Sequence, residues 1–96
     1  MNSKSLATEC IKEIGVALKK FGTYSFDDKG PTEVMDVDVL VKKFRKLSAE
    51  EAGKAILELA ESKEHDGRCE YLATTILCDL QDWDELFDIP GVADYL

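Results

Sequence analysis

The sequence predicts an all-α protein of four to five packed helices, arranged as antiparallel helical hairpins. Apolar residues recur at steps of three and four along most of the chain, which is the spacing of a helix with one buried face. A capping box, which marks the start of a helix, stands between Ser48 and Glu51. The 96 residues are 45% hydrophobic and 33% charged, which suits a single helical domain spanning residues 1–96.

The first predicted helix covers residues 5–21. Its apolar positions follow helical spacing and are Leu6, Cys10, Ile14, Ala17, Leu18 and Phe21. Lys19 and Lys20 lie in the last turn, where positive charge suits the helix dipole, and Gly22 suits the position after the end. Residues 22–31 contain Gly, Asp-Asp and Gly-Pro, which predicts a loop longer than the usual connection.

Residues 33–46 fit two patterns. Apolar and polar side chains alternate between residues 35 and 40, as in an exposed strand. A helical stripe also runs through the segment and comprises Val34, Val37, Leu40, Val41, Phe44 and Leu47. The segment ends in a basic cluster of Lys42, Lys43, Arg45 and Lys46. We predict a helix, because the segment is long for a strand and cations stabilise a helix end.

A third helix is predicted to begin at the capping box and to end near Lys63, and residues 64–67 are predicted to form a tight connection. The segments 48–63 and 67–81 then form a helical hairpin. A second pair made by the two earlier helices would resemble HEAT-type units, in architecture only.

The last predicted helix begins at about residue 67 or 68. Its apolar stripe contains Cys69, Leu72, Ala73, Ile76, Leu80, Trp83 and Phe87. Trp83 is expected in the core because it lies on this stripe. Pro90 and Gly91 end the helix. The sequence leaves open whether the helix continues through Asp82 or bends there.

The cysteine and histidine content predicts neither an enzyme nor a metal site. Cys10, Cys69 and Cys78 are an odd number without framework spacing, which predicts buried thiols in a reducing compartment. His65 and Cys69 fit one helix face, but a zinc site needs a second ligand pair and a buried thiol is a poor nucleophile. We expect no catalytic residue, no metal and no cofactor. An enzyme that uses His65 with Cys69 or Cys78 is the weaker hypothesis.

The sequence also argues against membrane and nucleic-acid partners. It contains no run of about 18 apolar residues. The N-terminal segment carries Glu9, Lys12 and Glu13 and lacks the apolar stretch of a signal peptide. The basic cluster at 42–46 is outweighed by a net charge of −8, which disfavours phosphate binding. We therefore expect a cytoplasmic protein.

The charge is distributed unevenly. Residues 1–68 contain all 12 basic residues and 13 of the 20 acidic ones, whereas residues 69–96 contain no Lys or Arg. The acidic residues of this last part are Glu70, Asp79, Asp82, Asp84, Glu85, Asp88 and Asp94. A solvated helix face usually mixes both signs, because like charges at helical spacing repel each other. The last segment therefore predicts a surface that attracts a basic partner.

The small size, acidity and helical character of the whole chain resemble the immunity proteins of bacterial toxin systems, including those of contact-dependent growth inhibition. The resemblance implies a cytoplasmic monomer that forms a 1:1 complex with a cognate toxin domain, often a basic nuclease, and covers its active or substrate-binding site. Charge and helical geometry predict contacts through Asp82, Asp84, Glu85 and Asp88, supported by Asp79, Asp94 and Tyr95. Tyr95 is expected to be free in the tail. The alternative is a small HEAT-like adaptor that binds a peptide or protein in an apolar groove.

Overall fold

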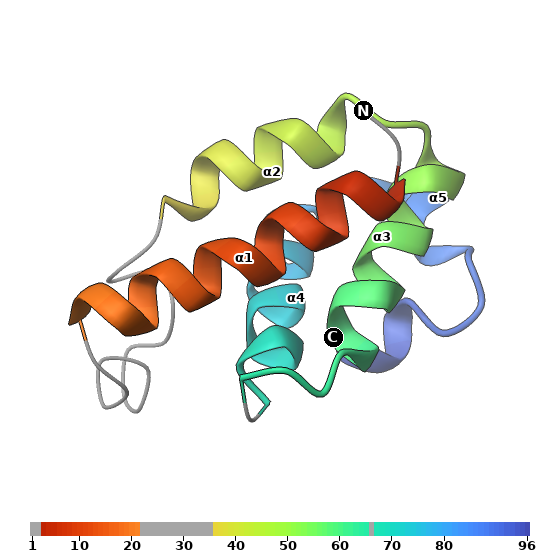
Figure 1. Cartoon of the computed structure of the whole chain (residues 1–96). Coiled ribbons are helices and arrows are strands. Elements are labelled where there is room, and N and C mark those ends of the chain that lie inside the picture. The colour runs from red at the N-terminus through yellow and green to blue at the C-terminus, as the bar shows by residue number, and fades with distance from the viewer. Residues whose placement is uncertain (1–2, 22–35, 66) are drawn as a thin grey trace.

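The computed structural model describes residues 3–21, 36–65 and 67–96, which form helices and turns without a strand (Figure 1). The elements are α1 (Ser3–Phe21), α2 (Val37–Arg45), α3 (Ala49–Glu61), α4 (Arg68–Asp79), α5 (Asp84–Phe87) and the 3-10 turn η3 (Ala93–Tyr95). The predicted all-α fold is therefore confirmed. The loop predicted over 22–31 lies outside the described residues. None of the described helices has the length and apolar character needed to cross a membrane.

The ambiguous segment is a helix where the structure describes it. Asp36 is the N-cap of α2, and its side chain accepts a hydrogen bond from the Val39 N–H at 3.3 Å. Asp38 follows in the first turn, where a carboxylate suits the helix dipole. The strand-like alternation thus came from two acidic residues that favour the start of a helix. Val39 is exposed, whereas Val37 and Leu40 on either side of it are buried.

The α3–α4 hairpin is also confirmed, and α3 is the central element of the fold. Its capping box forms as predicted in one direction, since Ser48 Oγ accepts a hydrogen bond from the Glu51 N–H at 3.2 Å. The helix ends at Glu61, two residues before the expected end at Lys63. α3 packs against α1, α4 and α5, and α1 crosses the hairpin (Figure 1). α1 contacts α2 only lightly, so the two earlier helices pair less closely than α3 and α4 do.

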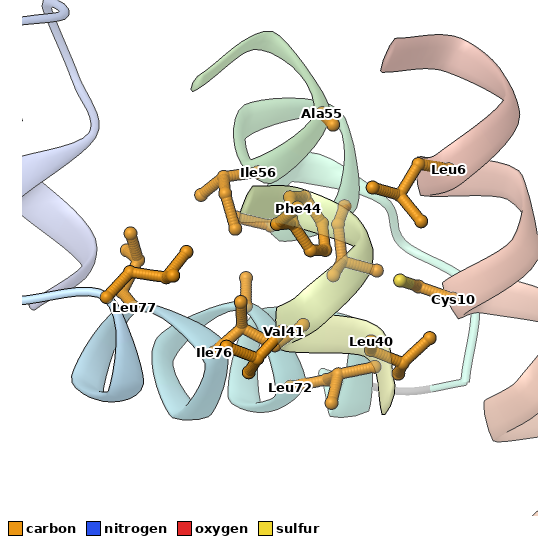
Figure 2. Close-up of a cluster of buried hydrophobic side chains, with 14 of the residues drawn as sticks. Leu6, Cys10, Leu40, Val41, Phe44, Ala55, Ile56, Leu72, Ile76 and Leu77 are labelled. Carbon is orange, nitrogen blue, oxygen red and sulfur yellow. The ribbon is translucent and has the colours of Figure 1, made fainter. Parts of the chain in front are cut away.

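The core lies where α1, α2, α3 and α4 meet. Phe44 of α2 is fully buried at its centre, among Leu6 and Cys10 of α1 and Ile56 of α3 (Figure 2). Small residues on α3, including Ala52 and Ala55, are also buried and follow the steps of three and four that run along most of the chain. The apolar stripes therefore identified the packing faces of the first four helices.

The predicted last helix breaks within its acidic part, directly after Asp79. α4 ends at Asp79, a turn follows, and α5 begins at Asp84, which settles the question that the sequence left open. The change of direction also alters which side chains are buried. Leu86 is fully buried, whereas Trp83 and Phe87, which the continuous helical stripe placed inside, are only half-buried and pack against the core.

Candidate functional site

The carboxylates of the predicted binding surface follow one another around the turn between α4 and α5. We call this set the acidic corner; its members are Asp79, Asp82, Asp84, Glu85 and Asp88. The first is the last residue of α4, the second lies in the turn, and the others lie in or directly after α5. All of them are exposed. The acidic corner thus consists of exposed carboxylates that alternate along residues 79–88 with apolar residues, of which Leu80 and Leu86 are fully buried.

Arg45 reaches the acidic corner from the end of α2. Its Nη2 atom donates a hydrogen bond to the carbonyl oxygen of Asp79 and another to Oδ1 of Asp82, each 2.9 Å long. The final carbonyl groups of an α-helix lack partners within the helix, so the first bond caps α4. The second bond is an ion pair. One guanidinium therefore ends α4 and holds the turn that follows it.

This pairing distinguishes Asp82 from the rest of the predicted contacts. The hydrogen bond from Arg45, together with its positive charge, holds the pKa of the Asp82 carboxyl below its ordinary value. The side chain of Asp82 remains 73% exposed, so water screens the pair. Because Asp82 already has a partner within the chain, it attracts an incoming cation less strongly than an unpaired carboxylate would.

The carboxylates of Asp84, Glu85 and Asp88 are in a different situation. Within the part of the chain that the structure describes, no hydrogen bond or ion pair joins these side chains to another residue. Asp84 and Glu85 occupy the first turn of α5, where negative charge is favourable. Within the acidic corner, these three carboxylates are the ones best able to attract a positively charged group of another molecule.

Asp94 and Tyr95 lie apart from the acidic corner, in η3. Asp94 is exposed. The expectation that Tyr95 is free in the tail is corrected, because its side chain is half-buried and packs against the core. Its carbonyl oxygen accepts a hydrogen bond from Thr74 Oγ1 at 2.9 Å, and the nearby Val92 is fully buried. These contacts fix the end of the chain against α4.

A second feature of this region is a groove on the outer side of α4, which sequence reasoning missed. It has a volume of about 480 Å³ and, among the described residues, is lined by Gly67, Glu70, Tyr71, Thr74, Thr75 and Cys78. We call it the α4 groove. Tyr71 and Thr75 lie off the apolar stripe, so periodicity assigned them to a solvated face. The available signal was Tyr71 itself, a large aromatic residue on the polar side of the helix, which is 47% exposed.

The cysteines divide into two kinds. Burial raises the pKa of the Cys10 thiol to about 12 and also raises the pKa of Cys69, whose Sγ lies 3.4 Å from the Glu64 carbonyl oxygen. Both thiols are therefore protonated and unreactive at neutral pH. Cys78 is exposed, which contradicts the prediction that all three are buried. It follows Leu77 on the outward side of α4, where the apolar stripe does not reach.

His65 joins the hairpin connection to α1. Its Nε2 atom lies 3.1 Å from the carbonyl oxygen of Ile11, and its ring is close to Gly15 on the same helix. Its backbone adopts a positive φ of 63°, in the left-handed region that residues other than glycine seldom occupy. Among the residues that the structure describes, no three His, Cys, Asp or Glu side chains form a group suited to a metal ion.

Comparisons with known proteins identify no relative of this chain. The chain has no significant match to a protein-family model, to a curated protein sequence or to a solved structure.

Proposed function

We propose that this protein binds a basic toxin domain and neutralises it, in the manner of a bacterial immunity protein. The observation that carries the proposal is the acidic corner. Its carboxylates are exposed, and Arg45 is the cation that reaches them within the described residues. A surface of this kind speeds the encounter with a positively charged partner and disfavours nucleic acid.

The proposed mechanism is occlusion. Asp84, Glu85 and Asp88 occupy positions on the toxin domain that phosphate groups of its substrate would take, if the toxin is a nuclease. Asp79 and Asp82 of the acidic corner supply supporting contacts, and so do Asp94 and the half-buried Tyr95 of η3. Charged pairs that lose their water in the interface set the orientation of the complex. The complex is a 1:1 assembly formed in the cytoplasm.

The test is a low-salt pull-down from the source bacterium, eluted with a salt gradient and identified by mass spectrometry. The expected result is one stoichiometric basic partner, whose toxic activity the protein abolishes when the two are mixed. A variant with Asp84→Lys, Glu85→Lys and Asp88→Lys should lose this partner. These positions are preferable to Asp82, because a lysine there would face Arg45 and disturb the fold.

A matched variant separates the position of the charges from their number. Glu13→Lys, Glu58→Lys and Glu61→Lys change the net charge equally at exposed sites on α1 and α3. This control should keep the partner. Equal loss in both variants, or a captured partner that resists salt in both, would contradict the proposed site.

The alternative function, a helical adaptor that binds a peptide or protein, needs an apolar groove, and the α4 groove is the candidate for it. Salt separates the two functions. Association driven by the acidic corner slows steeply as ionic strength rises, whereas binding dominated by apolar burial responds little.

A further inference from the structure

The α4 groove has the form of a site for a neighbouring side chain or helix. Two rows of residues at i, i+4 spacing border it: Glu70, Thr74 and Cys78 form one row, and Gly67, Tyr71 and Thr75 form the other. Rows of this spacing are the ridges between which a second helix packs. Gly67 carries no side chain, so the groove is open at the start of α4.

The groove is largely apolar in character even though two threonines line it. Thr74 Oγ1 donates to the Tyr95 carbonyl oxygen, and Thr75 Oγ1 donates to the Tyr71 carbonyl oxygen, each at 2.9 Å. Both hydroxyl protons are therefore used within the chain. The only charged side chain that lines the groove among the described residues is Glu70. An occupant thus meets an aromatic ring, methyl groups and one carboxylate.

Along the chain, the acidic corner begins directly after the last residue that lines the groove. Cys78 at one end is followed directly by Asp79, the first member of the acidic corner. The Thr74–Tyr95 hydrogen bond brings η3, with Asp94, to the side of the groove. The six described residues that line the groove are fewer than the about 20–30 residues that a stable protein interface uses on each side. An apolar centre surrounded by charged residues is the usual anatomy of such an interface.

We propose that the α4 groove receives an amphipathic, cationic segment of the basic partner, with an apolar side chain against Tyr71 and a Lys or Arg beside Glu70. The proposal rests on the proposed function and names the apolar centre of the same interface. Charge complementarity selects the occupant. Among the described residues, the charged side chain that lines the groove is Glu70, and further carboxylates follow in the chain. An acidic segment would be repelled, and a neutral segment would gain little attraction.

The test uses a synthetic helical peptide of about 18 residues built from Leu and Lys at helical spacing. Two matched peptides carry Glu or Gln in place of every Lys. Chemical-shift changes in the NMR spectrum of the full chain locate each peptide. The Lys peptide should shift the amides of Tyr71, Thr75 and Cys78, with weaker binding of the Gln peptide and none of the Glu peptide.

Two variants test the contacts. Tyr71→Ala should raise the Kd of the Lys peptide by about tenfold, as loss of an interface aromatic does. Val16→Ala truncates another exposed apolar side chain, on α1, and should leave the Kd within about twofold. Both variants should keep the circular dichroism of the parent. Equal effects of the two variants, equal binding of the Lys and Gln peptides, or shifts confined to another surface would each overturn the inference.

A hexalysine peptide, which has no apolar side chain, tests the acidic corner separately. If it shifts the amides of Asp84, Glu85 and Asp88 while the amphipathic peptide avoids the groove, the groove inference fails and the proposed function stands. If hexalysine leaves the corner unchanged and charge reversal there leaves the captured partner bound, the proposed function fails, and the groove inference fails with it.

Discussion

The end of α2 and the acidic corner both concentrate charge within a few residues, but the charges differ in whether they have partners within the fold. At the end of α2, Lys43 lies 2.9 Å from Glu9 of α1, and Arg45 lies 2.9 Å from Asp82. At the acidic corner, Asp84, Glu85 and Asp88 lack such partners among the described residues. Paired charges connect elements of the fold, whereas unpaired carboxylates remain available to another molecule.

Apolar side chains attach both regions to the core. Phe44 is fully buried on the α2 side. Leu86 is fully buried in α5, and Ile89 after it packs against the core beside Gly53 of α3. If these apolar side chains hold the acidic corner against the core, removing its charges should leave its position in the fold unchanged.

The largest effect is expected for Phe44→Ala. Removing a fully buried ring should lower the free energy of unfolding by about 3–5 kcal/mol, measured by urea denaturation. Val39→Ala in the same helix is the control and should cost much less, because Val39 is exposed. Similar costs for the two variants would show that α2 is not held by Phe44.

Gly53→Ala tests the apolar attachment of the acidic corner. A Cβ atom at this position would overlap Cδ1 of Ile89 and press against its Cγ2, so the Ile89 side chain must shift. We expect a loss of about 1–3 kcal/mol in the free energy of unfolding. Repeating the substitution in an Ile89→Ala background should reduce that loss. An equal loss in both backgrounds would contradict the close approach of Ile89 to α3.

A double-mutant cycle measures the pair on the α2 side. Glu9→Gln and Lys43→Gln should show a coupling of about 0.5–1 kcal/mol, because both side chains are about one-third exposed. The Glu50–Lys54 pair on α3 is the comparison, with an N–O distance of 3.2 Å and much greater exposure. Its coupling should be smaller, about 0.3 kcal/mol. The reverse order would show that burial does not decide the strength of these pairs.

We expect the Arg45–Asp82 pair to make the stability of the fold depend weakly on pH. The pKa of the Asp82 carboxyl is lower in the folded protein than in the unfolded chain, so the pair stabilises the fold fully above the ordinary Asp pKa. This contribution is lost as the pH falls through the lowered pKa. The difference in Tm between the parent and Asp82→Asn should therefore be constant at neutral pH and shrink under acid conditions. A difference that grows as the pH falls would have the wrong sign.

The smallest effect on stability is expected at Asp88. Asp88→Ala should change the free energy of unfolding by less than about 0.5 kcal/mol, because its side chain has no partner in the described structure. Asp36→Ala removes a carboxylate of similar exposure that caps α2, and should cost about 1 kcal/mol. Thermal unfolding of the two variants provides the measurement. A larger loss at Asp88 would remove the distinction between structural and available carboxylates.

Local features of the sequence were predicted best. The capping hydroxyl of Ser48 and the helical spacing of Leu40 and Phe44 depend on residues a few positions apart, so the sequence was sufficient to place them. The end of α4 is capped instead by Arg45, which is 34 residues before Asp79. No pattern in the sequence records that contact. The continuous stripe through Trp83 therefore failed at the point where a distant residue ends the helix.

The candidate site was predicted in part for the same reason. The exposure of Asp84 and Glu85 followed from their position among charged residues. The internal partner of Asp82 and the burial of Tyr95 required the tertiary structure. The α4 groove was missed because hydrophobic periodicity identifies the buried side of a helix and says nothing about hollows on the other side.

The reach of Arg45 has a consequence for how such a protein changes over generations. Residue 45 sets the net charge of the acidic corner from a different helix, so replacing it with a neutral residue makes the corner more negative by one unit. No residue within the corner itself needs to change. Under the proposed function, the attraction of the acidic corner for a basic partner is therefore adjustable from residue 45, which lies outside the corner.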